Sequence, residues 1–293
     1  MYTCDYYPAT DLEETLNELA DNKHAMVLAG GTDLLPRIRS KDIAPQLLVD
    51  IHRLPFSRIV KEDGVIRIGA LVTISELLSS LVLKQSFPAI IEAGGQIAGP
   101  PIRNRATVAG NLVNASPAAD LAPPLLIYDA NLILRSRSGD RIVPLCDFFI
   151  SPGKTLLESG ELVVEIQLQP SELPTAGKFL KFGKRRAMAI AVASTAVSIS
   201  LDEAGLLCNS RIALGSVAPK PIRSYQAESI LNGSRPSEAI FKTAAEMAIQ
   251  DADPITDIRA TREFRQHIVG VLVRRALESG WSELKEKVRD GRN

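Results

Sequence analysis

The sequence has 293 residues, a formal net charge of zero and 45% hydrophobic residues. A chain of this length is predicted to form one large or two modest domains and to fold without disulfide bonds. The balanced charge argues against a nucleic-acid partner and a polybasic membrane anchor, and no apolar run approaches the roughly 18 residues that predict a membrane span.

The three cysteines, Cys4, Cys146 and Cys208, are widely spaced and form no C-x-x-C pair. This pattern predicts free thiols in a reducing compartment, and it argues against a structural zinc site or an iron–sulfur cluster in this chain. The first residues contain neither the basic nor the apolar region of a secretion signal. We therefore expect a cytoplasmic protein with no metal site and no membrane span.

The first part of the chain alternates between short helices and strands. Residues 11–21 are predicted to be a helix, because Asp11 can cap it and Glu14 follows three residues later, as in a capping box. Further along, the apolar patterns predict strands at 26–29, 47–51 and 65–69, and helices at 74–83 and 89–95.

Residues 99–124 are rich in glycine and proline. They predict a long surface loop, and a loop of this length inside a compact domain is more often functional than idle. Within it, Ser116 and Pro117 have the residue types of an N-cap and a first helical position. Asp120 is then expected in the first turn of that helix, where acidic residues are also common for electrostatic reasons alone.

In the remaining sequence, the apolar patterns predict longer strands and helices than in the first part. The polar segment 169–174, with two prolines, is the best candidate for a domain boundary, which gives domains at 1–172 and 173–293. We expect two α+β units rather than an alternating doubly wound sheet. The predicted elements are a hairpin of strands 131–135 and 141–143, a strand at 161–168, two long strands at 190–201 and 206–215, and helices at 237–249 and 262–279.

Two glycine-containing motifs suggest chemistry. In the first, a strand runs into Gly30-Gly31, and Thr32 or Asp33 can cap the helix that follows. Such a turn allows backbone N–H groups to approach a phosphate. It matches neither G-x-G-x-x-G nor a P-loop, so by itself it leaves a nucleotide site and a plain tight turn both open.

The second motif joins Thr107, which offers a hydroxyl, to Asn111, which offers an amide, with Gly110 between them. Taken together, the two motifs and the following Ser-Pro-x-x-Asp resemble the FAD-binding subunits of molybdenum hydroxylases, the family that includes xanthine dehydrogenase and the carbon monoxide dehydrogenase medium subunit. The resemblance continues through nearly the whole chain, at residues 160–166, 179–186, 257–261 and 271–277.

The resemblance implies an FAD-binding domain of the p-cresol methylhydroxylase type, followed by a smaller α+β domain with antiparallel strands and C-terminal helices. It also implies a set of residues for non-covalent FAD. Backbone amides at Leu28, Ala29, Gly30, Gly31, Thr32, Asp33, Leu34 and Leu35 would hold the pyrophosphate. Thr107, Val108, Ala109, Gly110 and Asn111 would form the second cofactor loop, Asp120 would bind the adenosine half, Ile97 and Val163 would make apolar contacts, and Lys181 would approach the flavin.

The function implied by the resemblance is an electron relay. Partner subunits would carry the molybdenum cofactor and 2Fe–2S clusters, and FAD in this chain would pass electrons to NAD or another acceptor. No catalytic residue is expected here, so His24, His52 and His267 are interpreted as surface or core residues. Two alternatives stay open: a self-contained flavin oxidoreductase of the same fold, and a non-catalytic nucleotide-binding scaffold.

Three further details bear on this interpretation. The chain lacks the cysteine-bearing insertion of 4-hydroxybenzoyl-CoA reductase flavin subunits, which argues against that subclass. Residues 187–189 are Ala-Met-Ala where xanthine dehydrogenases carry acids, which argues against xanthine as the substrate. The segment 178–186 holds five Lys or Arg residues and is interpreted either as part of a docking surface for an iron–sulfur subunit or as a solvated strand end.

Overall fold

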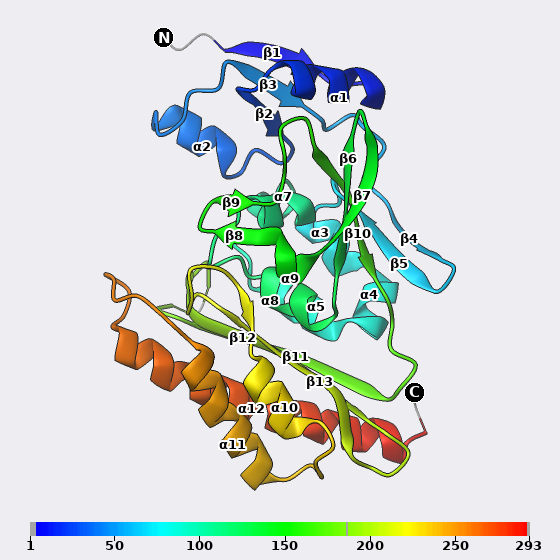
Figure 1. Cartoon of the computed structure of the whole chain (residues 1–293), viewed down its shortest axis with the longest axis vertical. Coiled ribbons are helices and arrows are strands. Elements are labelled where there is room, and N and C mark those ends of the chain that lie inside the picture. The colour runs from blue at the N-terminus through cyan, green and yellow to red at the C-terminus, as the bar shows by residue number, and fades with distance from the viewer. Residues whose placement is uncertain (1–3, 186, 292–293) are drawn as a thin grey trace.

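The computed structural model describes residues 4–185 and 187–291 and contains three main sheets with helices packed around them (Figure 1). Strands and helices are both abundant but do not alternate regularly along the chain, so the α+β class expected from the sequence is confirmed. None of the helices described is both long and apolar enough to cross a membrane.

The N-terminal sheet has three parallel strands in the order β1-β3-β2. The Asp11 carboxylate accepts a hydrogen bond from the Glu14 N–H at 2.9 Å, so the predicted cap of the first helix is confirmed, although only this half of the capping box forms. The elements are β1 (Asp5–Pro8), α1 (Leu12–Asp21), β2 (Ala25–Leu28), α2 (Leu34–Arg39) and β3 (Leu47–Asp50).

A five-stranded antiparallel sheet follows, in the order β4-β5-β10-β6-β7. Its strands alternate, so that Ile66, Ile68, Leu132 and Leu134 are fully buried on the face that the helices cover. The strands are β4 (Ile59–Glu62), β5 (Val65–Gly69), β6 (Asn131–Ser136), β7 (Gly139–Pro144) and β10 (Leu162–Leu168), and a small hairpin of β8 (Phe149–Ser151) and β9 (Lys154–Thr155) follows α9 (Leu145–Phe148).

The helices of this part are short because capping residues interrupt them. The predicted helix 74–83 is two helices, since the Ser80 backbone is extended and its hydroxyl accepts the Leu83 N–H at 3.4 Å. The helices are α3 (Ile74–Ser79), α4 (Leu81–Ser86), α5 (Pro88–Gly95), α6 (Pro100–Arg103), α7 (Val108–Val113) and α8 (Ala122–Ile127).

The interpretation of residues 99–124 as one long surface loop is wrong, because α6, α7 and the start of α8 lie within them. The expected helix start at Ser116-Pro117 is also wrong. The Ser116 hydroxyl accepts the Ala118 N–H at 3.2 Å and closes only a single turn. The helix begins at Ala122, with prolines in its first turn, so Asp120 lies in the turn before it.

The C-terminal part is a four-stranded antiparallel sheet in the order β11-β12-β13-β14. Its first long strand, β11, follows the segment 169–174 directly and was not among the two strands predicted here. The elements are β11 (Thr175–Gly183), β12 (Ala191–Leu201), β13 (Leu207–Gly215), β14 (Ile222–Arg223), α10 (Tyr225–Leu231), α11 (Glu238–Asp251) and α12 (Arg262–Arg289).

This sheet is covered on both faces (Figure 1). Helix α12 packs on one face, where Val197 and Ile199 of β12 share a core with Val273 and Leu277. Helices α5 and α8 pack on the other face, where Phe179 joins the core of the N-terminal part. The C-terminal sheet is therefore placed directly against helices α5 and α8 of the N-terminal part.

Candidate functional site

The first glycine loop follows the end of β2, beside β3 in the parallel sheet. Gly31 has φ +71°, a conformation that L side chains rarely adopt. Among the described residues, the backbone N–H groups from Gly30 to Asp33 have no hydrogen-bond acceptor. Asp33 stands at the N-cap of α2, but its side chain makes no cap bond and lies 3.7 Å from Arg37 instead. Four consecutive donors are thus open to an anion.

The second loop is held in place by its own hydrogen bonds. The Thr107 hydroxyl accepts the Gly110 N–H at 3.1 Å and caps α7. The N–H of Val108 donates to the carbonyl of Val72 at 2.9 Å. Because Thr107, Val108 and Ala109 are buried, their side chains fix the loop and leave its exposed backbone, around Gly110, for contact with a ligand.

The two loops touch at Gly30. A side-chain carbon at this position would overlap the backbone carbonyl of Arg105, two residues before Thr107 at the start of the second loop. Gly30 is therefore required for the approach of one loop to the other, whereas Gly31 is required for its backbone angle. The structure thus brings together two motifs that are far apart in the sequence.

Two buried side-chain oxygens, one at the end of the second loop and one in the turn before α8, lack a partner within the described protein. They are Oδ1 of Asn111 and Oδ1 of Asp120. Buried polar atoms are normally hydrogen-bonded, so each unpaired atom requires an explanation. A ligand rich in hydroxyl and N–H donors supplies one, and FAD is such a ligand. The residues present therefore fit FAD.

Asp120 also forms an ion pair with Lys181, whose Nζ lies 2.6 Å from Oδ2. The side chains are only 11% and 5% exposed, and Lys181 also donates to the carbonyl of Gln96 at 3.3 Å. Burial raises the pKa of Asp120 above its ordinary value, and the charge and hydrogen bond of Lys181 oppose this rise. The pair therefore brings Lys181, on β11 of the C-terminal sheet, into the site.

This ion pair bears on two expectations. Asp120 was assigned to the adenosine half of FAD and Lys181 to the flavin, which are opposite ends of the molecule. Side chains in direct contact cannot reach both ends of an extended FAD, so at least one of the two assignments must be revised.

Ile97 and Val163, the two residues expected to make apolar contacts with FAD, differ in their exposure to solvent. Ile97 is partly buried, and its carbonyl accepts a hydrogen bond from Arg103 at 3.1 Å. Val163 is only 5% exposed and belongs to the core beneath the five-stranded sheet. Any contact of Val163 with a cofactor would therefore involve its backbone or a small part of its side chain.

The structure contains a cavity of about 700 Å³ beside Lys181. Its walls come from residues 95–103 and from the end of β11 with the loop that follows it. Lys181 is the one predicted site residue that lines it, and the glycine loops lie outside it. Arg103, which was not predicted as a site residue, holds this wall by donating to the carbonyls of Gly95, Ile97 and Ala98.

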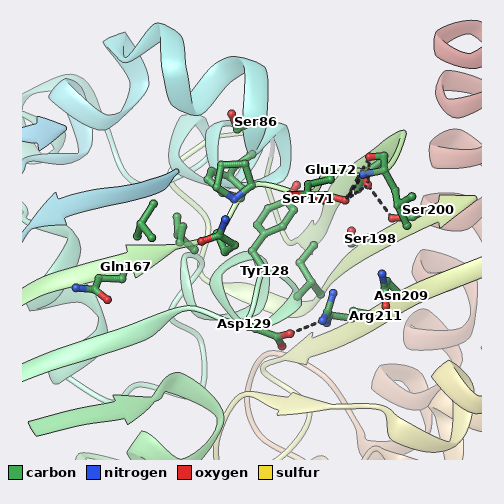
Figure 2. A pocket seen from close by; sticks show the side chains of 18 of the residues that line it. Ser86, Tyr128, Asp129, Gln167, Ser171, Glu172, Ser198, Ser200, Asn209 and Arg211 are labelled. Carbon is green, nitrogen blue, oxygen red and sulfur yellow. Dashed lines mark hydrogen bonds and ion pairs between the residues drawn. The ribbon is translucent and has the colours of Figure 1, made fainter. Parts of the chain in front are cut away.

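A second cavity, of about 590 Å³, lies where the segment 169–174 passes between the two larger sheets. Figure 2 shows Tyr128 in this cavity, with the ion pair of Asp129 and Arg211 nearby. Serine, asparagine and glutamine side chains line it together with apolar ones such as Phe87 and Leu168, and none of the predicted site residues does.

The basic segment 178–186 is not the charged surface that its sequence indicates. Lys178 lies 2.6 Å from the carboxylate of Glu283 and 3.3 Å from that of Glu92, and Lys181 is paired with Asp120. Two of the five cations are therefore neutralised inside the protein, and the interpretation as a continuous basic docking segment is wrong for them. Arg186 lies outside the described residues.

The three histidines are exposed. His52 contacts Asp50, with Nδ1 2.8 Å from Oδ1, and none of the three lies in either cavity. Within residues 4–185 and 187–291, no cluster of His, Cys, Asp or Glu has a metal-binding arrangement, and the three cysteines are free.

Comparison with known proteins identifies this arrangement. The family described as the FAD binding domain in molybdopterin dehydrogenase matches residues 2–171. The family described as the CO dehydrogenase flavoprotein C-terminal domain matches residues 178–279. The chain therefore belongs to the FAD-binding subunits of the molybdenum hydroxylase family, and the resemblance seen in the sequence is confirmed.

Individual relatives cover nearly the whole chain. A putative xanthine dehydrogenase FAD-binding subunit of Escherichia coli K12 is 36% identical over 93% of this chain and 94% of its own length. A 6-hydroxypseudooxynicotine dehydrogenase complex subunit alpha of Paenarthrobacter nicotinovorans is 34% identical, with 93% of each chain covered. The solved carbon monoxide dehydrogenase of Hydrogenophaga pseudoflava superposes with a TM-score of 0.91 at 32% identity, over 95% of this chain and 97% of that one. The protein is thus an FAD-binding oxidoreductase subunit.

Proposed function

We propose that this chain relays electrons from an iron–sulfur partner subunit, through non-covalently bound FAD, to NAD or another acceptor. A second partner, carrying the molybdenum cofactor, performs the substrate chemistry. The observation that carries the proposal is the pair of touching glycine loops, with four open N–H donors in the first loop and a buried, unpaired acceptor, Asn111 Oδ1, in the second.

The chain's own residues divide the binding of FAD between them. The loop from Leu28 to Leu35 holds the pyrophosphate through its open amides, and the loop from Thr107 to Asn111 supplies the Asn111 acceptor. When bound, FAD supplies a carrier that can accept and release electrons singly or in pairs. We revise the assignment of Asp120 and place it, together with Lys181, at the flavin end of FAD. The reason is that the cavity beside Lys181 has room for a ring system and is lined partly by Phe182 and Met188.

Lys181 has a distinct role in this scheme. Its ammonium is held by Asp120 and by the Gln96 carbonyl, so it is a fixed positive charge in a largely dry setting. A fixed cation favours negative charge on a neighbouring group most strongly where water is excluded. Lys181 therefore favours the electron-loaded form of the cofactor.

Two observations on purified protein test the proposal. The absorbance spectrum should show the visible bands of oxidised flavin, and acid precipitation should release the flavin into the supernatant, because neither glycine loop contains a histidine or cysteine for a covalent link. Purification from the native host should also yield iron and molybdenum in companion subunits. Absence of flavin would support a nucleotide-binding scaffold, and flavin without companions would support a self-contained oxidoreductase.

A further inference from the structure

Helix α5 and its C-cap are hydrogen-bonded to strand β11 at two points (Figure 1). At the first point, Oε2 of Glu92 accepts the backbone N–H of Phe179 at 2.7 Å. At the second, the carbonyl of Gln96, the C-cap residue, accepts a hydrogen bond from Nζ of Lys181 at 3.3 Å. The second contact holds the ammonium that we place beside the flavin, and the first holds the strand that carries it.

The two contacts have matching spacings on the helix and on the strand. Glu92 and Gln96 are four residues apart, which is about 6 Å along a helix. Phe179 and Lys181 are two residues apart, which is about 7 Å along a strand, and side chains with this spacing lie on the same face of a sheet. Both contacts therefore require one register of β11 against α5, because a shift by one residue would turn Lys181 to the other face.

Both carboxylate oxygens of Glu92 are used in holding β11. This strand is at the edge of its sheet, where outward-facing N–H groups have no neighbouring strand to accept them. An ionised carboxylate is a stronger acceptor for such a group than a neutral oxygen. Oε1 of Glu92 lies 3.3 Å from Nζ of Lys178, which is also 2.6 Å from a carboxylate oxygen of Glu283 on α12.

We propose that Glu92 is a positioning residue for Lys181: its carboxylate sets the register of β11 against α5 and so fixes the Lys181 ammonium relative to the flavin. This inference rests on the proposed function, since it assumes a flavin beside Lys181. The interaction of two charges weakens as their separation grows, so releasing β11 weakens the effect of Lys181 on the electron-loaded flavin. Loss of the negative charge of Glu92 acts in the opposite direction, because a nearby anion disfavours electron loading.

The test measures the reduction potential of the bound flavin by anaerobic titration against a redox dye. Glu92→Ala removes the acceptor of the Phe179 N–H, Glu92→Gln keeps an acceptor without the charge, and Lys181→Met is the reference for loss of the cation. Glu283→Ala is the matched control, because it removes a carboxylate from the same Lys178 and leaves the acceptor of the Phe179 N–H in place. FAD content and stability in urea are measured first, and Glu92→Asp, whose side chain is shorter, replaces Glu92→Ala if that variant does not retain FAD.

We expect Lys181→Met to lower the equilibrium constant for two-electron reduction of the flavin about tenfold, which is about 30 mV. Glu92→Ala should lower it in the same direction, by about threefold, and should add nothing in the Lys181→Met background. Glu92→Gln should not lower it. Glu283→Ala should reduce stability, because it breaks the ion pairs with Lys178 and Lys287, but should not lower the potential.

Lowered stability of Glu92→Ala without a lowered potential would overturn the positioning role and leave the proposed function intact. Equal increases in the potential of Glu92→Ala and Glu92→Gln would also overturn it, because Glu92 would then act through its charge alone. An unchanged potential in Lys181→Met would overturn the role of Lys181 and with it that of Glu92. Wild-type protein that binds no flavin would overturn the proposed function itself.

Discussion

Lys181 and Asp120 lie 61 residues apart in the sequence and form a buried ion pair in which nitrogen and oxygen are 2.6 Å apart. The pair connects β11 of the C-terminal sheet to the turn before α8. One oxygen of Asp120 has no partner, which leaves the pair able to accept a further hydrogen bond.

Removing one partner of this pair should lower the free energy of unfolding by more than the intact ion pair contributes to it. Lys181→Met or Asp120→Asn leaves one charge or one polar group buried without its partner, so we expect a loss of about 3–5 kcal/mol in the free energy of unfolding without FAD. The double variant should recover part of that loss. Urea denaturation of the four proteins measures the coupling.

Arg135 and Asp140 provide the control for this cycle, because their side chains pair at 2.6 Å but are 36% and 42% exposed. Asp140→Asn should cost less than about 1 kcal/mol. Additive effects of Lys181→Met and Asp120→Asn would show that the two side chains do not interact in solution.

Gly31 should be needed for cofactor binding through its backbone angle. Gly31→Ala forces a side chain into φ +71° and should cost about 1–2 kcal/mol of stability while reducing FAD affinity. Gly205→Ala, at φ +74° in the hairpin between β12 and β13, imposes the same strain with open space around it. It should cost similar stability and leave FAD binding unchanged. Titration of both apoproteins with FAD distinguishes the effects, and equal affinities would count against the loop as a cofactor cradle.

Gly30 does not serve for the same test. A side chain there meets the Arg105 carbonyl, so Gly30→Val should separate the two loops whether or not FAD is present. Loss of flavin in that variant would report a change of fold as well as a change of cofactor contact.

Asn111 offers a test that separates binding from stability. Its Oδ1 is buried and unpaired, so Asn111→Leu should leave the stability of the apoprotein unchanged or raise it. The same change removes an acceptor from the proposed site and should weaken FAD binding about tenfold. Ser210→Ala removes another buried, unpaired oxygen, on β13, and should leave FAD binding as it is. A fall in apoprotein stability with unchanged FAD affinity would mean that Asn111 has a structural role.

The hydrogen bonds of Asp257, which hold the loop that carries Ile258, should depend on pH. Burial acts to raise the pKa of Asp257, but hydrogen bonds from Arg259, Arg265 and the backbone outweigh it and hold that pKa well below its ordinary value of 3.8. A carboxyl with a lowered pKa stabilises the folded state above its ordinary pKa, and this contribution is lost as the pH falls below about 4.

Asp257→Asn should therefore be less stable than wild type at pH 7, and the difference should narrow as the pH is lowered to 3. Thermal unfolding across this range measures both curves. A difference that stays constant with pH would show that Asp257 does not contribute through its charge.

Local patterns predicted the glycine turn, the cap of α1 and most strands, because these depend on neighbouring residues. The start of α8 was mispredicted, since Ser116 closes a separate turn and the helix begins only at Ala122. The pair of Lys181 and Asp120 and the contact of Gly30 with Arg105 depend on how distant segments pack, which spacing along one sequence does not encode. The family resemblance supplied Gly30, Asp120 and Lys181 as candidates but placed Asp120 and Lys181 at opposite ends of FAD, and it did not supply Arg105.

The measurement that tests the relay most directly is anaerobic reduction of the bound flavin. The purified, FAD-loaded chain is mixed with aldehydes, purines and aromatic heterocycles, with and without its iron–sulfur and molybdenum subunits, and flavin bleaching is followed. We expect no bleaching by any substrate with the chain alone, and bleaching by the substrate of the complex once the partners are added. Rapid bleaching of the isolated chain by one of these compounds would contradict the relay and establish a self-contained oxidoreductase.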